Sequence, residues 1–102
     1  MIHVTDLEMS EVLAILKQHV KNGNVVVFGS RYKGTFKPYS DLDIAVVKHD
    51  ETSMTIREYG DLKEAFEESE LNFRVDVIDY WGISKEFRVI IDRGCELIYE
   101  SK

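Results

Sequence analysis

Two short apolar runs joined by one loop constrain the fold of this chain more than any other feature. The first run is VVVF at residues 25–28 and ends in a Gly-Ser pair; the second covers residues 40–47. Runs this short and this rich in β-branched residues are typical of buried strands. The second run differs because it carries two carboxylates, Asp41 and Asp43, one residue apart. Paired acids inside an otherwise apolar strand raise the question of a functional role.

The rest of the sequence predicts further helices and strands around this pair. In chain order they begin with a helix from the capping box Thr5–Glu8 to Lys21-Asn22-Gly23, a helical turn after the Gly-Ser pair and a Pro-containing loop at 35–39. They continue with a long helix capped by Thr52 or Ser53, a strand at 73–78, a helix at 84–93 and a strand at 96–100. This order predicts an α/β (α+β) fold with a small mixed sheet of three to four strands flanked by helices.

Helical spacing of apolar residues predicts which side of the last two helices faces the sheet. The expected inward residues are Tyr59, Leu62, Ala65 and Phe66 in the long helix, and Phe87, Ile90 and Ile91 in the last one.

Composition limits the class of protein. A length of 102 residues fits one domain, 1–102, and 44% hydrophobic with 31% charged residues is the balance of a soluble globular protein. No apolar stretch approaches the roughly 18 residues that span a bilayer, and the N-terminus lacks a signal-peptide pattern, so we expect a cytoplasmic protein without membrane contact. The net charge of -6 argues against broad attraction to nucleic acid.

The paired acids have the geometry of a metal site. Alternation along a strand places Asp41 and Asp43 on one face, with Cα atoms about 6.6 Å apart. Carboxylate oxygens on a rigid strand suit Mg²⁺ or Mn²⁺, and Asp76 in the next strand offers a third carboxylate from the side. The alternative is that these acids are the wet face of an ordinary antiparallel strand.

The Gly-Ser pair favours the metal interpretation. Gly29 lets the backbone approach a ligand closely, and the amides of the following turn can hold a phosphate together with the Ser30 hydroxyl. Arg31 and Lys33 add positive charge beside it. A Gly-Ser pair alone is an ordinary turn, but here the next strand brings the acids back beside it. A phosphate cradle facing paired acids indicates phosphoryl or nucleotidyl transfer.

The stretch FGSRYKGTFKPYSDLDIAV resembles the signature of the DNA polymerase β-type nucleotidyltransferases, and most closely that of their minimal members, the MNT domains. The resemblance extends over almost the whole chain, including FRVDVID around Asp76, and implies a polymerase β-like core. It also implies two Mg²⁺ ions: Asp41 and Asp43 would bridge both, and Asp76 would hold the catalytic ion. Gly29 and Ser30 would bind the β and γ phosphates of ATP.

The MNT domains it resembles are antitoxins of HEPN–MNT toxin–antitoxin modules. The resemblance therefore implies a partner, a HEPN ribonuclease toxin encoded nearby, and transfer of AMP to a toxin hydroxyl, expected to be a tyrosine. Two alternatives remain open. One is a small-molecule nucleotidyltransferase of the aminoglycoside-modifying kind; the other is a non-catalytic antitoxin that neutralises its toxin by binding alone.

Overall fold

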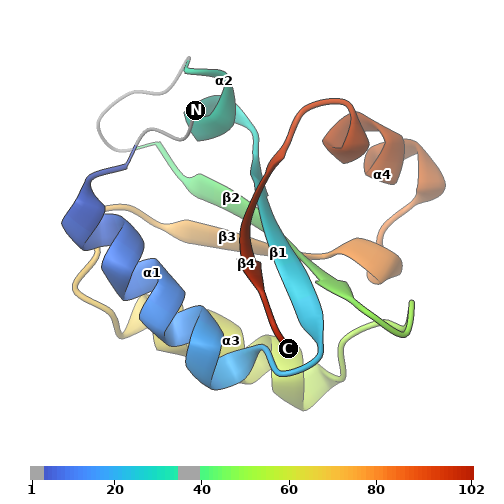
Figure 1. The fold of residues 1–102 in the computed structure, drawn as a ribbon, viewed down its shortest axis with the longest axis horizontal. Helices are drawn as coiled ribbons and strands as arrows, with labels where there is room; N and C mark the ends of the chain where they lie inside the picture. Colours follow the sequence, from blue (N-terminus) through green and yellow to red (C-terminus); the bar gives the residue numbers. More distant parts are fainter. Residues whose placement is uncertain (1–3, 35–39) are drawn as a thin grey trace.

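The computed structural model describes residues 4–34 and 40–102, so the loop predicted at 35–39 lies outside the described residues. In this part of the chain the elements are α1 (Asp6–His19), β1 (Gly23–Phe28), α2 (Ser30–Lys33), β2 (Leu42–Lys48), α3 (Ile56–Glu67), β3 (Val75–Asp79), the 3₁₀ turn η1 (Tyr80–Gly82), α4 (Lys85–Asp92) and β4 (Glu96–Glu100) (Figure 1). Their order is the predicted one except for η1, which was not predicted.

The four strands form one mixed sheet in the order β3-β2-β1-β4. β1 runs antiparallel to both of its neighbours, whereas β2 and β3 are parallel. A parallel pair needs a long crossover, and α3 provides it. The end of β1 and the beginnings of β2 and β3 consequently lie at the same edge of the sheet. This arrangement confirms the predicted fold class.

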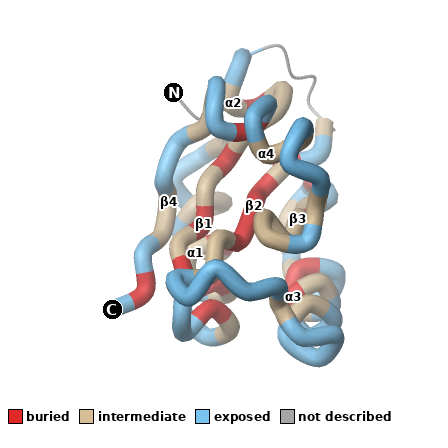
Figure 2. Tube along the Cα trace, turned by 90° about the vertical axis from the view of Figure 1, so that its right-hand side faces the viewer, coloured by how far each residue is buried: buried red, intermediate tan, exposed pale blue. Residues whose placement is uncertain are grey.

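One face of the sheet is closed by α1 and α3, which contact each other (Figure 1). Alternate strand residues point into this face, so burial along β1 follows the period of two that a strand imposes, whereas β2 has three consecutive buried residues, Ile44, Ala45 and Val46 (Figure 2). The residues at its centre are fully buried: Val12, Leu16, Val25, Val27, Leu42, Ile44, Leu62 and Val77. We call this side of the sheet the closed face.

Helix boundaries confirm one prediction and correct two. Thr5 and Glu8 form the predicted capping box, with Glu8 N donating to Thr5 Oγ1 at 3.1 Å and Thr5 N to Glu8 Oε1 at 2.8 Å. α1 ends at His19, before the predicted stop, because Gly23 belongs to β1. A Cβ at Gly23 would lie 2.8 Å from the carbonyl oxygen of Val47, so the glycine serves strand pairing rather than helix termination.

The cap predicted for the long helix is also wrong. Thr55 caps α3 through a capping box with Glu58, whereas the Thr52 hydroxyl donates to Asp50 Oδ1 at 2.6 Å. Thr52 therefore stabilises the preceding turn, and the helix begins later than predicted.

The opposite face of the sheet is covered only in part, by η1 and α4 (Figure 1). Under this cover Ala45 and Ile91 are buried, and the ring of Phe28 packs edge-on against Phe87 with centroids 6.1 Å apart. The prediction that Ile90 faces inward is wrong, because its side chain is 62% exposed. We call this side the open face.

No helix within residues 4–34 and 40–102 is both long enough and apolar enough to cross a membrane.

Candidate active site

Asp43 lies near the start of β2 on the open face, since the flanking residues Leu42 and Ile44 are buried in the closed face. Its register partners are Phe28 on β1 and Asp76 on β3. Neighbouring strands lie about 4.8 Å apart, so Asp43 and Asp76 have adjacent carboxylates on the same face. The structure thus brings together two of the three predicted acids from different strands.

Asp41 occupies a less regular position than the sequence predicts. The second strand starts at Leu42 rather than at residue 40, so Asp41 precedes it and is exposed. The amide of Leu42 donates to the carbonyl of Arg74 at 2.8 Å, which fixes the start of this strand against the residue before β3. Strand alternation alone therefore does not orient Asp41.

The charges of the other two acids, Asp76 and Asp41, act on Asp43. Burial, and after it the neighbouring carboxylates of Asp76 and Asp41, together raise the pKa of Asp43 from 3.8 to about 6. Like charges gathered at one edge of a sheet favour binding of a cation, because a cation relieves both the repulsion and the cost of burial. The three acids thus form one electrostatic unit.

The donor chemistry fits a hard cation, but the side chains do not form a ready-made cluster. Within residues 4–34 and 40–102, no three His, Cys, Asp or Glu side chains lie close enough to hold a metal ion. Oxygen ligands from carboxylates are those that Mg²⁺ prefers, and Mg²⁺ commonly takes only one or two carboxylates with substrate phosphates and water. Asp43 and Asp76 suffice for such a site.

Gly29 directly abuts the carboxylate of Asp43. Its φ of 77° is in the left-handed region that favours glycine, and a Cβ there would overlap Asp43 Oδ2. The position therefore requires glycine on both conformational and steric grounds. It also places the start of α2 next to the acids.

α2 is a single turn that begins directly after Gly29. Gly29 is its N-cap, and the amide of Gly34 donates to the Ser30 carbonyl at 2.8 Å to close the turn. The first amides of a helix have no partner within it, so those at the start of α2 are suited to an anionic ligand. Ser30 is half-buried and Lys33 is exposed on the same turn. The residues predicted to form the phosphate cradle, Gly29 and Ser30, thus lie at the start of this turn.

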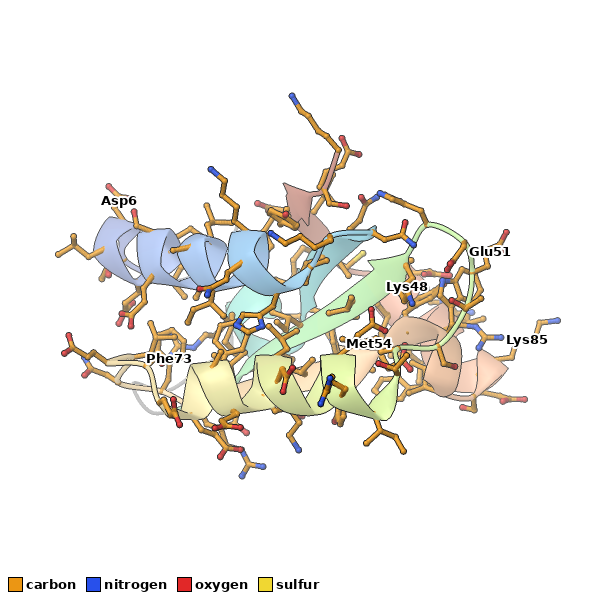
Figure 3. All side chains as sticks on the ribbon, turned by 90° about the horizontal axis from the view of Figure 1, so that it is seen from below. Asp6, Lys48, Glu51, Met54, Phe73 and Lys85 are labelled. Carbon is orange, nitrogen blue, oxygen red and sulfur yellow. The ribbon has the colours of Figure 1, made fainter. Side chains whose placement is uncertain are left out.

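Arg31 is placed differently from the expectation that it lies beside a phosphate. It is only 4% exposed, its guanidinium lies 4.2 Å from the ring centroid of Phe73, and its Nε donates to the Ser40 carbonyl at 3.1 Å. Phe73 lies beside the C-terminal end of α3, at the opposite end of that helix from Met54 (Figure 3). Arg31 therefore ties α2 to the segments that precede β2 and β3.

Two cavities flank the acids, and the sequence did not reveal either. One, of about 410 Å³, is lined by Gly29 and Lys33 together with Phe28, Phe87, Ile90, Arg93 and Gly94. The other, of about 370 Å³, includes Asp76 and is lined by residues of α3 and of the segment leading into β3. The one sign of the first cavity is that the apolar side chain of Ile90 is exposed. This exposure depends on tertiary packing, so the sequence does not predict it.

Comparisons with known proteins identify the family of this fold. Residues 10–102 match the family model described as polymerase beta, nucleotidyltransferase. The chain is 42% identical over 95 residues to the probable protein adenylyltransferase MntA of Haemophilus influenzae, covering 93% of this chain and 82% of that one.

Solved structures share the fold at lower identity. A toxin–antitoxin crystal structure with AMP-PNP matches with a TM-score of 0.75 at 20% identity, covering 92% of this chain and 74% of that one. The MntA–HepT toxin–antitoxin structure matches with a TM-score of 0.68 at 16% identity, covering 95% and 74%. With a family model that covers nearly the whole chain, this protein belongs to the polymerase β-type nucleotidyltransferases.

Proposed function

We propose that this chain is a Mg²⁺-dependent adenylyltransferase that moves AMP from ATP to a hydroxyl, a tyrosine, of a cognate HEPN toxin and so acts as its antitoxin. The observation that carries the proposal is the position of Asp43, between Asp76 on one strand and Gly29 at the start of α2. This position joins the acids to a phosphate cradle. The 42% identical relative, a probable protein adenylyltransferase, supports AMP as the transferred group.

Each residue has a role that follows from its place. Asp43 and Asp76, with Asp41 beside them, would hold up to two Mg²⁺ ions once substrate phosphates and water complete the coordination, with Mn²⁺ as a substitute; the metal would supply a Lewis acid for the phosphates. A cation held by Asp43 and Asp76 would orient the α-phosphate at the open face. The amides after Gly29 and the Ser30 hydroxyl bind the β and γ phosphates that leave as pyrophosphate.

Arg31 is left out of the nucleotide-binding set because its guanidinium is already buried against Phe73. Its contribution is to position α2, and through α2 the cradle. Lys33 remains in the set because it is exposed beside Gly29.

The toxin as partner is supported by the solved structures of the same fold, which are toxin–antitoxin complexes. A partner would also supply what this sheet lacks, since the open face has no further layer to hold an acceptor within the described residues. The aminoglycoside-type alternative would need an acceptor site formed by such a further layer on the open face, and this makes it the weaker candidate.

The test combines labelled ATP, Mg²⁺, this protein and the HEPN protein encoded beside it, followed by intact mass measurement of both chains. Native protein should add AMP to the partner. Asp76→Ala should still associate with the partner and retain ATP affinity while losing transfer, because the substitution removes one carboxylate but leaves the cradle intact.

Growth of cells that co-express toxin and variant separates a catalyst from a binder. If Asp76→Ala rescues growth as well as native protein, neutralisation works by contact, and the AMP-transfer proposal fails. Continued toxicity with a well-expressed variant is the expected result.

A further inference from the structure

We propose that Arg31 is a positioning residue for Asp41, the acid that strand alternation does not orient. The Arg31 side chain holds the peptide group that precedes Asp41, and this contact sets the direction in which the Asp41 carboxylate leaves the backbone. The inference rests on the proposed function, because it concerns the metal site, and it goes beyond the placement of α2.

Asp41 lies where regular structure gives it little support. It precedes β2, which begins at Leu42, and it is exposed. Inside a strand the sheet sets the direction of each side chain, whereas the direction of a residue before the strand depends on its own φ and ψ. Contacts outside the sheet ladder must therefore fix these two angles.

Both peptide groups that flank Asp41 are held by hydrogen bonds. On its N-terminal side, Arg31 Nε donates to the Ser40 carbonyl at 3.1 Å. On its C-terminal side, the Leu42 amide donates to the Arg74 carbonyl at 2.8 Å. A residue has only two soft backbone dihedrals, one toward each flanking peptide plane. Anchoring both planes thus fixes the direction of the Asp41 side chain, and Arg31 provides one of the two anchors.

Arg31 can serve as an anchor because its own side chain is fixed. Its guanidinium is buried 4.2 Å from the ring centroid of Phe73, which is labelled in Figure 3 and is itself buried. A guanidinium is planar, so it can lie over a ring while its Nε–H donates sideways to a carbonyl, here that of Ser40. The donor of Arg31 therefore has a defined position relative to the segment that leads into β3.

The same side chain links the parts of the candidate active site. Arg31 directly follows Ser30 of the cradle, and Phe73 lies three residues before Asp76. Within the described residues no three acidic, His or Cys side chains are close enough to hold a metal ion, so a bound metal has to draw the Asp41 carboxylate toward it. With the Asp41 backbone held, only side-chain torsions need to change, and this lowers the entropy cost of assembling the site.

The test compares two arginines that make the same kinds of contact. Arg88 lies 5.5 Å from the ring centroid of Trp81 and donates through Nη1 to the Ile83 carbonyl at 2.8 Å, so its contacts are with η1 and the residue after it. Arg31→Met and Arg88→Met each remove a donor and a charge and keep an unbranched apolar chain. Thermal unfolding of both variants shows whether they remain folded.

The first readout needs no metal. The NMR coupling constant between the amide and α protons of Asp41 reports its φ angle. In Arg31→Met this constant should shift toward the value of an unstructured chain, and in Arg88→Met it should stay at the native value. The second readout is Mn²⁺ binding, measured by electron paramagnetic resonance of the free ion. Arg31→Met should bind Mn²⁺ about tenfold more weakly, and Arg88→Met should differ from native protein by less than about twofold.

An unchanged Asp41 coupling constant in folded Arg31→Met overturns the inference, as does equal Mn²⁺ affinity of the two methionine variants. If Arg31→Met does not fold, Arg31→Lys takes its place. Lysine keeps the charge but lacks the planar group that contacts Phe73 and Ser40 together, so Mn²⁺ affinity should fall by about threefold. Native coupling constant and native affinity in Arg31→Lys then overturn the inference.

Failure of the proposed function gives different results. If native protein transfers no AMP but Asp41 and Mn²⁺ respond to Arg31 as expected, the proposed function fails and the positioning role stands. If native protein binds no Mn²⁺, the metal assignment fails and the coupling constant alone decides the role of Arg31. If transfer occurs and the Asp41 coupling constant does not depend on Arg31, only the positioning role fails.

Discussion

The two faces of the sheet use adjacent residues of one strand for different purposes. On β2, Leu42 and Ile44 are fully buried beneath α1 and α3, whereas Asp43 between them points to the open face beside Asp76. The closed face has two long helices that begin with capping boxes; the open face has a 3₁₀ turn and an eight-residue helix. Residues that stabilise the core and residues of the candidate active site thus alternate along the same strand.

This difference between the two faces explains why the fold can accommodate three neighbouring carboxylates. Removal of a carboxylate from the open face leaves the closed-face packing untouched and relieves repulsion among Asp41, Asp43 and Asp76. Removal of an apolar side chain from the closed face leaves the acids in place but opens a cavity. Substitutions at neighbouring residues should therefore affect different measured quantities.

The largest expected effect is on catalysis, from Asp43→Asn. AMP transfer should fall by roughly 1,000-fold or more, because the bound metal supplies several kcal/mol of transition-state stabilisation and Asp43 is central to its site. The free energy of unfolding at neutral pH should be unchanged or higher. Radiolabel transfer at saturating Mg²⁺ together with urea denaturation measures both. Near-native transfer by this variant would disprove the metal assignment.

Ile44→Ala, one residue further along, should lower stability but leave ATP binding unchanged. Ile44 is fully buried, so the loss of its side chain should lower the free energy of unfolding by about 2–5 kcal/mol. At a temperature where the variant is folded, its ATP affinity should match that of native protein. A large loss of ATP affinity in the folded variant would show that the two faces are not independent.

The join between α2 and the open face is tested by Gly29→Ala. The positive φ and the overlap with Asp43 should together cost about 1–3 kcal/mol of stability, with weaker ATP binding, because the carboxylate must move. Gly60→Ala is the matched control. A Cβ at Gly60, inside α3, meets nothing within 4 Å, so this change should stabilise the protein by about 0.5–1 kcal/mol. Equal effects of the two substitutions on stability would remove the steric argument.

The sequence predicted the fold well because its local signals agree. Apolar runs and alternation predicted the four strands and the α-helices in the correct order, although not the 3₁₀ turn η1. In the structure, the parallel pairing of β2 with β3 puts Asp76 beside Asp43. Boundaries failed where a tertiary contact decided them. Gly23 was taken for a helix stop, yet it serves strand pairing against Val47.

Side-chain roles were less predictable than elements. Arg31 follows the Gly-Ser pair directly, so proximity in sequence suggested a phosphate ligand, but stacking on Phe73 decides its direction. Ile90 fits the apolar stripe of its helix, yet it is exposed because α4 covers only part of the open face. Residue type and period do not encode how completely one element covers another.

The pH dependence of stability that Asp43 imposes on the open face is expected to be smaller than the effects of Asp43→Asn, Ile44→Ala and Gly29→Ala. Its pKa in the folded protein is about 6, above the ordinary 3.8, so the folded state holds the proton more tightly than the unfolded state. The free energy of unfolding should therefore fall as pH rises from about 4 to about 6 and then level off. Solvent screening should limit the fall to about 1–2 kcal/mol.

Urea denaturation of native protein and of Asp43→Asn across this pH range measures the difference, which the variant should lack. Added Mg²⁺ should reduce the fall for native protein alone, because a cation at the open face stabilises the ionised carboxylate. The closed-face variant Ile44→Ala should keep the native pH dependence at lower overall stability. Identical curves for native protein and Asp43→Asn would show that burial and the neighbouring acids do not raise the pKa of Asp43.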